Sequence, residues 1–186
     1  MKELSLNVLD IAKNSVKAKA TLISIRLEET EEAFTMTISD NGCGMSEEIL
    51  RGVIDPFCTT RKTRKVGMGI PLLKMAAEQT GGTVHIASRH VTDFPDTHGT
   101  DVTALFYKKH IDFTPLGDIV STLTTLIQGR PEIDFEFLHT TDRFRVMLDT
   151  RQLREILGEE IPLSSPEIIL WIAQYLGEQY ANLSIN

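Results

Sequence analysis

Hydrophobic and polar residues follow two periods along the chain, and each period predicts one type of element. Apolar residues spaced three and four positions apart predict helices at residues 1–19, 71–80, 115–128 and 151–157, with a last helix from Pro166. Strict alternation of apolar and polar residues predicts strands at 21–27, 34–38, 83–88, 100–106, 133–137 and 144–148. A short helix is expected after Ser46, because this N-cap residue precedes two glutamates. The pattern predicts an α+β fold, a two-layer sandwich in which helices cover one face of a mixed sheet.

The chain divides into two parts of different character. We expect one domain at 1–110, a short linker near 109–114 and a small C-terminal α+β appendage at 111–186. In the appendage, the residues from His139 to Asp142 are expected to form a hairpin turn between two strands. The last helix carries a wide apolar stripe, which is typical of a core-facing helix but also fits a surface that docks a partner.

The stretch from Ser39 to Met45 is the first candidate binding site. It follows an alternating strand, and its Asp-Asn-Gly-x-Gly sequence cannot continue that strand. Asp40 would present a carboxylate beside bare backbone at Gly42 and Gly44, which suits a flat ligand with an exocyclic amine such as adenine. An ordinary hairpin turn is the alternative interpretation.

The N-terminal helix carries a polar stripe opposite its apolar face. Asp10, Asn14 and Lys17 are spaced by four and three residues, so they project from the same side. An amide oxygen such as that of Asn14 is a good ligand for magnesium. For Lys17 a solvated helix face explains the pattern equally well.

A second glycine-rich segment directly precedes a predicted helix. Gly67, Met68 and Gly69 lead into a helix with Pro71 in its first turn. Exposed amides and the helix dipole favour anions at such a point. The preceding basic residues at 61–65 lie in a segment without hydrophobic period, which suits a loop that contacts a polyphosphate.

Composition narrows the functional classes. The 186 residues are 41% hydrophobic and 24% charged, with a net charge of -7, so a general nucleic-acid binder is a poor interpretation. No apolar run approaches the length of a membrane span, and charged residues within the first ten argue against a signal peptide. We expect a cytoplasmic protein that binds neither membrane nor nucleic acid. Cys43 and Cys58 lack metal-ligand spacing and are interpreted as reduced thiols.

The order of these motifs resembles the GHKL ATPase superfamily of gyrase, ninety-kilodalton heat-shock chaperones, histidine kinases and MutL. The shared features are the asparagine helix, the Asp-x-Gly-x-Gly loop, the Asp-Pro-Phe-x-Thr-Thr-Arg segment, the Gly-x-Gly helix and the Gly-Thr strand. The resemblance covers residues 1 to about 108 and is greatest for the histidine-kinase catalytic domain. It implies a Bergerat-type fold that binds ATP with magnesium.

The resemblance also implies roles for single residues. Asp40 would bind the adenine amino group, Gly42 and Gly44 would admit the base, and Asn14 would hold magnesium while Lys17 touches phosphate. Gly67 and Gly69 would flank the triphosphate, Phe57 would anchor the lid, and Arg61 would stand where kinases usually carry a lysine. Asp10 stands four residues before Asn14, where the superfamily ATPases have a glutamate as general base and histidine kinases often have asparagine. It would orient water or a hydroxyl, or it would only support the magnesium shell. The other nucleotide-binding positions would be Met45, Thr60, Met68 and Thr100.

The histidines bear on whether a kinase of this kind could phosphorylate itself. None of the five follows the pattern of an exposed helical histidine before an acidic residue: His85, His90, His98, His110 and His139. The chain also begins at the asparagine helix, so we expect a kinase or regulatory ATPase acting in trans on another protein, as the anti-sigma-factor kinases do. The alternative is a non-catalytic module that binds a protein in response to nucleotide. The sequence leaves the oligomeric state open.

Overall fold

The architecture is a single sheet with helices on one of its faces. A computed structural model describes residues 3–54, 68–158 and 161–181. Its sheet has six strands in the order β3-β4-β2-β1-β5-β6. The strands are β1 (Leu22–Glu29), β2 (Ala33–Asp40), β3 (Thr83–Arg89), β4 (Gly99–Tyr107), β5 (Asp134–Thr141) and β6 (Arg145–Asp149). The helices are α1 (Leu4–Lys17), α2 (Glu47–Ile54), α3 (Gly69–Gln79), α4 (Ile119–Gly129), α5 (Thr150–Leu157) and α6 (Pro166–Ala181).

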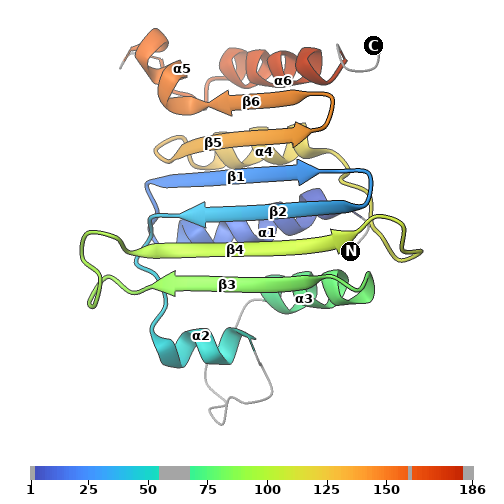
Figure 1. Cartoon of the computed structure of the whole chain (residues 1–186). Coiled ribbons are helices and arrows are strands. Elements are labelled where there is room, and N and C mark those ends of the chain that lie inside the picture. Colours follow the sequence, from blue (N-terminus) through green and yellow to red (C-terminus); the bar gives the residue numbers. More distant parts are fainter. Residues whose placement is uncertain (1–2, 55–67, 159–160, 182–186) are drawn as a thin grey trace.

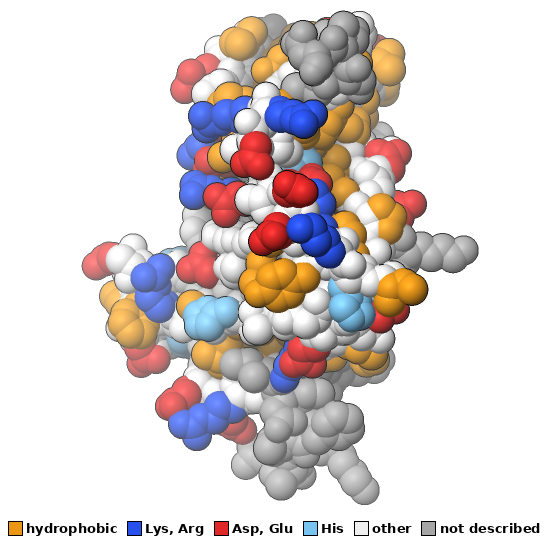
Figure 2. Space-filling view, turned by 45° about the vertical axis from the view of Figure 1, so that its right-hand side comes forward, with side chains coloured by type: hydrophobic (Ala, Val, Ile, Leu, Met, Phe, Trp, Pro, Cys, Tyr) orange, Lys and Arg blue, Asp and Glu red, His pale blue; other side chains and the backbone are white. Residues whose placement is uncertain are grey.

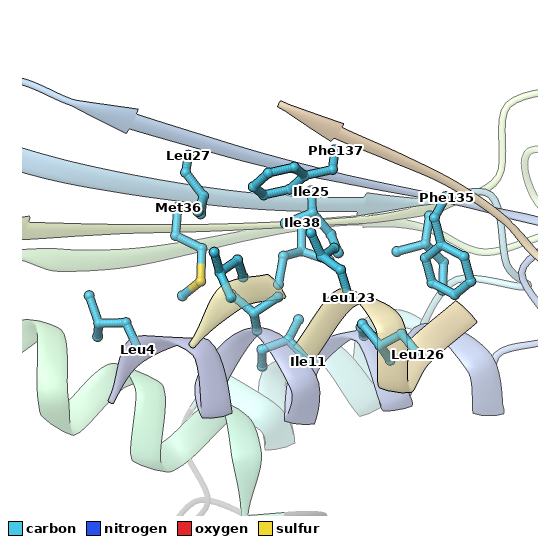
Figure 3. Packing of buried hydrophobic residues seen from close by; sticks show 14 of the residues in the cluster. Leu4, Ile11, Ile25, Leu27, Met36, Ile38, Leu123, Leu126, Phe135 and Phe137 are labelled. Carbon is cyan, nitrogen blue, oxygen red and sulfur yellow. The ribbon is translucent and has the colours of Figure 1, made fainter. Parts of the chain in front are cut away.

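The sheet is mixed, because one of its strand pairs is parallel. β5 runs parallel to β1, with Phe137 opposite Ile25, whereas the other neighbouring strands are antiparallel. Helices α1, α3 and α4 lie together on one side of the sheet (Figures 1 and 3). The predicted fold class, a mixed sheet covered by helices on one face, is confirmed.

The hydrophobic core lies between the sheet and these helices. Alternate residues of the central strands point inward, such as Ile25, Met36 and Phe137, while α1 and α4 contribute Ile11 and Leu123 from the other side (Figure 3). All five side chains are at most 2% exposed. Because a strand turns successive side chains to opposite faces, this packing accounts for the period-2 pattern in the sequence.

The C-terminal segment joins the N-terminal part in two places. Its strand β5 pairs with β1, and the carbonyls of Pro115 and Leu116 accept hydrogen bonds from the first amides of α1, at Leu4 and Ser5. The helix expected at 115–128 therefore begins later, at Ile119, where the Asp118 side chain caps it. The division of the chain into domains at residue 110 stays a prediction.

The turn expected at residues 139–142 begins later in the structure, so the predicted start at His139 is wrong. His139 lies inside β5, opposite Leu27 of β1, and only 2% of it is exposed. The strand continues to Thr141, whose amide bonds the carbonyl of Phe144 across the turn. Pairing with the full length of β1 extends this strand beyond the point that local turn residues suggest.

Charges of both signs mix on the visible surface. Figure 2 shows Lys and Arg side chains interspersed with Asp and Glu rather than gathered by sign. Ion pairs join neighbouring elements of the fold, including Arg26 with Glu136 and Arg154 with Asp134. Among the described residues, no helix is both long enough and apolar enough to span a membrane.

Candidate functional site

Asp40 ends strand β2 with its carboxylate held from two sides. The hydroxyl of Ser15, on α1, donates to Oδ2 at 2.6 Å. The amide of Gly42 donates to Oδ1 at 2.8 Å. The side chain is half-buried. Two donors from different elements thus fix the plane of this carboxylate and leave further lone pairs on both oxygens.

The two glycines of the loop are required by neighbouring backbone. A Cβ on Gly42 would lie 2.7 Å from the carbonyl oxygen of Ala18. Gly44 has a φ of +67°, and a Cβ there would lie 2.0 Å from the carbonyl oxygen of Arg89. The amide of Cys43 also bonds the Ala18 carbonyl, at 2.8 Å. The loop is therefore clamped between the end of α1 and the end of β3, while the roles of Gly42 and Gly44 toward a ligand stay predictions.

Asn41 is a structural member of the loop that sequence reasoning did not single out. Its Oδ1 accepts the amides of Thr21 and Leu22, both at 2.9 Å, and its Nδ2 donates to the Thr21 hydroxyl. Since Thr21 directly precedes β1, these bonds tie the loop to the start of that strand. Its place between an aspartate and a glycine was the available signal, since asparagine side chains commonly bond backbone in such turns.

Thr100 lies beside Asp40. The resemblance implied that both residues lie near the nucleotide, and their proximity agrees with this expectation. The two residues are paired across β2 and β4. The Thr100 hydroxyl is 2.8 Å from that of Ser88, which in turn accepts the amide of Met45 at 2.8 Å. Ser88 was missed, although a polar residue at an inward position after Val84 and Ile86 is a usable signal. Through Ser88, the structure connects Met45 and Thr100.

His98 reaches the same loop from the connection between β3 and β4. Its Nδ1 lies 2.6 Å from the carbonyl oxygen of Gly42. The following residue, Gly99, has a φ of +141°, and a Cβ there would lie 2.0 Å from the Asp40 carbonyl oxygen. The sequence assigned His98 no function and indicated only that it does not follow the pattern of a phosphoacceptor histidine.

The polar stripe of α1 leads from this loop to the start of α3. A Cβ on Gly69, the first residue of α3, would lie 3.2 Å from the Cβ of Asp10. Asp10 and Asn14 are half-buried, whereas Lys17, in the last turn of α1, is exposed. Since Ser15 of the same helix bonds Asp40, α1 connects the carboxylate of the loop to the N-terminus of α3.

The predicted residues thus fall into two contact groups joined by α1. One contains Asp40, Gly42, Gly44, Met45 and Thr100, and the other contains Asp10 and Gly69, with Met68 at the N-cap of α3. Met68 is two-thirds exposed, and within the described chain no side chain caps the first turn of α3. Four further predicted positions lie outside the described residues: Phe57, Thr60, Arg61 and Gly67.

Curated relatives match the N-terminal part of the chain. The sensor histidine kinase YvrG of Bacillus subtilis is 31% identical over 102 residues, which cover 52% of this chain and 17% of YvrG. The tetrathionate sensor histidine kinase TtrS of Salmonella typhimurium is 32% identical over 97 residues, which cover 52% of this chain and 16% of TtrS. The chain thus matches only about a sixth of the length of these relatives.

A solved structure shares the fold over a longer stretch. The MutL ATPase domain of Aquifex aeolicus, complexed with ADP, superposes with a TM-score of 0.56 at 13% identity, covering 84% of this chain and 69% of that one. At this identity the likeness concerns the fold alone. A family model described as "Histidine kinase-, DNA gyrase B-, and HSP90-like ATPase" matches residues 2–110, more than half of the chain. The motif order, the fold and this match agree: the chain belongs to the histidine kinase-, DNA gyrase B- and HSP90-like ATPase family.

Proposed function

We propose that the chain binds ATP with magnesium and acts in trans, as a protein kinase or regulatory ATPase in signalling. The observation that carries the proposal is the fixed carboxylate of Asp40, with donors from Ser15 and Gly42 on its two oxygens. A carboxylate in this state is an oriented acceptor for the amino group of adenine. The family match and the ADP in the MutL complex support the same ligand class.

The phosphates of ATP would lie toward the start of α3. A helix N-terminus offers backbone donors and the positive end of the helix dipole. Pro71 has no amide hydrogen, and the amide of Leu72 already bonds the Met68 carbonyl. The amides of Gly69 and Ile70 have no partner among the described residues, so they would be the donors to an anion. Lys17, exposed in the last turn of α1, would add a positive charge.

The side-chain oxygens on the polar stripe of α1 are suitable ligands for a magnesium ion. Asn14 offers an amide oxygen and Asp10 a carboxylate oxygen, and the helical spacing of four residues places them on one face. Among the described residues, no group of three or more His, Cys, Asp or Glu side chains could hold a metal. Magnesium bound through Asn14 would therefore complete its shell with phosphate and water. When bound, such an ion neutralises phosphate charge.

Asp10 has two candidate roles in this proposal. It could accept a proton from the attacking hydroxyl or water, as a general base does. It could instead orient the shell of the magnesium ion that Asn14 holds. Its packing against Gly69, at the N-terminus of α3, suits both roles.

Calorimetric titration of Asp40→Asn with ATP tests the ligand. The amide presents a donor where the adenine amine needs an acceptor, so we expect the Kd to rise at least about tenfold, the usual cost of a lost bond to a charged group. Circular dichroism should show an unchanged fold. An unchanged ATP affinity in the folded variant would overturn the assignment of Asp40.

The same titration of Asn14→Ala, with and without magnesium, tests the metal. Alanine removes the amide oxygen at little cost to the helix, since alanine is the better helix former. We expect ATP binding by the variant to become insensitive to magnesium, whereas wild-type affinity should depend on it. Equal magnesium dependence in both proteins would contradict the role of Asn14.

A non-catalytic module that responds to nucleotide is the second candidate, and one observation favours it. Helix α1, which carries Asp10 and Asn14, begins on the carbonyls of Pro115 and Leu116. A shift of α1 on nucleotide binding would therefore be transmitted to the segment after residue 110. In this case ATP would bind without turnover, and the nucleotide would change the affinity for a protein partner instead.

A further inference from the structure

His98 contacts the Asp40 loop with one defined ring atom. Its Nδ1 lies 2.6 Å from the carbonyl oxygen of Gly42, and the side chain is half-buried. A carbonyl oxygen only accepts hydrogen bonds, so Nδ1 must carry the proton. The contact therefore fixes the ring orientation and assigns the proton of the neutral ring to Nδ1.

Gly42 takes part in two hydrogen bonds, one with His98 and one with Asp40. The carbonyl of Gly42 accepts from His98, and the amide of Gly42 donates to Asp40 Oδ1 at 2.8 Å. Gly42 also packs against Ala18 too closely for any side chain. The position of its amide, and with it the plane of the Asp40 carboxylate, thus depends on contacts on three sides of one residue.

The backbone of His98 is itself fixed by strand β4. Gly99 is buried against the Asp40 carbonyl, where a Cβ would lie 2.0 Å from the oxygen. Thr100, the next residue, pairs with Asp40 in the sheet. His98 is therefore placed by the same strand that borders Asp40, so its ring approaches Gly42 from a rigid support.

We propose that His98 is a positioning residue for recognition of the adenine amino group. By bonding the carbonyl of Gly42, it holds this residue in the position from which its amide, in the preceding peptide, donates to Asp40 Oδ1. The contact thereby keeps the carboxylate oriented toward the amine. His98 itself contacts no atom of the ligand in this scheme. The inference rests on the proposed function, because it assumes that Asp40 binds adenine.

Two nucleotides and two variants test the role. Purine ribonucleoside triphosphate lacks the exocyclic amine of ATP, so it reports on binding that does not use Asp40. In His98→Asn the side-chain Nδ2 lies as many bonds from the backbone as the histidine Nδ1 and can donate to the same carbonyl. In His98→Ala the donor is lost. His90→Ala is the matched control, since His90 lies in the same connection but its Nδ1 accepts from the Thr92 amide.

We expect His98→Ala to weaken ATP binding about fivefold to tenfold, the range of one net hydrogen bond. Its affinity for the purine analogue should change less than about twofold, and His98→Asn should restore ATP binding to within about twofold of wild type. His90→Ala should match wild type with both nucleotides. Calorimetry gives each Kd, and thermal melts establish that the variants are folded.

The outcomes separate this inference from the proposed function. If His98→Ala keeps full ATP affinity, or loses affinity for both nucleotides equally, His98 does not position Asp40 and the inference is wrong. Failure of His98→Asn to restore binding when the variant is folded would also overturn it. If wild-type protein binds neither nucleotide, or binds both equally, the assignment of Asp40 to adenine fails and this inference fails with it.

Discussion

Each of the two ends of the sheet holds a polar cluster. The two clusters differ in the surroundings and the solvent exposure of their polar side chains. At the end where β2 terminates, Asp40 is half-buried and meets glycine-rich backbone. At the opposite end, Glu29 closes β1 beside Lys108, while His139 and Tyr180 complete the second cluster. Figure 1 shows these ends on opposite sides of the molecule. We refer to them as the Asp40 end and the His139 end.

At the His139 end the polar groups lie in aromatic surroundings. The ring of His139 contacts those of Phe34, Phe144 and Tyr180 at centroid distances of 6.3, 5.5 and 5.8 Å. Its Nδ1 bonds the Tyr180 hydroxyl at 2.9 Å, and its Nε2 lies 3.4 Å from Glu29. These residues come from β1, β2, β5, α6 and the β5–β6 turn, so the cluster joins the segment after residue 110 to the family-matched part.

The comparison separates two uses of polar residues in one sheet. At the Asp40 end, short backbone contacts orient a carboxylate that keeps free lone pairs and remains partly accessible. At the His139 end, bulky rings enclose the polar atoms and join elements that are distant in sequence. Burial within aromatic rings favours a stabilising role, whereas orientation with accessibility favours binding. Variants at the two ends should therefore change different quantities.

The largest effect is expected for Asp10→Asn, a variant in the candidate binding site and not at the His139 end. If Asp10 is the general base, the variant should keep its ATP affinity while turnover falls roughly 10²–10⁴-fold. Steady-state assays with labelled ATP measure both phosphoryl transfer and hydrolysis. The free energy of unfolding should change little, because Asp10 is only half-buried.

Asp10→Asn also decides between the two proposed functions. A nucleotide-gated binder would show negligible turnover in the wild type, with and without candidate protein partners. Turnover that is equally fast in wild type and variant would exclude the general-base role and leave the ATPase proposal standing. Partners must be included, since a kinase without its protein substrate resembles a binder in this assay.

His139→Ala should have the next largest effect, on stability instead of turnover. It opens a cavity among three aromatic rings and leaves the Tyr180 hydroxyl without its hydrogen-bond partner. We therefore expect a loss of about 2–4 kcal/mol in the free energy of unfolding. Urea denaturation measures the loss. His85→Ala is the control, since that histidine is exposed on β3 and should change stability by less than about 0.5 kcal/mol. A His139→Ala protein as stable as the control would contradict the contrast between the two ends.

Most of the fold could be predicted from local periodicity. The alternation from Phe34 to Ile38 located β2, and Ser46 marked the start of α2, where its hydroxyl lies 3.4 Å from the Ile49 amide. The position of β5 beside β1 could not be predicted, because parallel pairing joins segments about a hundred residues apart and leaves no local signal. The error at His139 has the same cause, since its neighbours suggested a turn while the pairing with β1 continued the strand.

Candidate site residues could be predicted from the sequence where the type of residue and its neighbours in the chain indicate a chemical role. Asp40 and the glycines of its loop could be named as candidates because a carboxylate beside glycine-rich backbone is informative within the chain itself. Asn14 could be named because an amide is a poor helix former but a good magnesium ligand. Their roles toward a ligand stay predictions. Ser88 and His98 act through contacts with Met45 and Gly42, which lie more than forty residues away. Such contacts depend on the arrangement of the sheet, so a single sequence does not reveal them.

The smallest expected effect is a pH dependence that originates at the His139 end. Loss of water around the buried ring lowers the pKa of His139 below its ordinary value, and Lys108 acts in the same direction, whereas Glu29 opposes both. The hydroxyl of Tyr180 is hydrogen-bonded to Nδ1 of His139. Burial raises the pKa of Tyr180 well above its ordinary value, so this phenol is neutral. Neutral His139 is therefore the form that the folded protein favours.

The sign of the effect follows from this lowered pKa. Above about pH 6.5, the ordinary pKa of histidine, His139 is neutral in both the folded and the unfolded chain, and its contribution to stability is complete. Below that pH the unfolded chain binds a proton first, so the free energy of unfolding falls until the pH passes the lower, folded-state pKa. We expect urea denaturation at pH 7.5 and 5.5 to show a larger loss for wild type than for His139→Phe, which cannot titrate. The exposed histidines are common to both proteins, so an equal loss in the two would mean that His139 is not the group responsible.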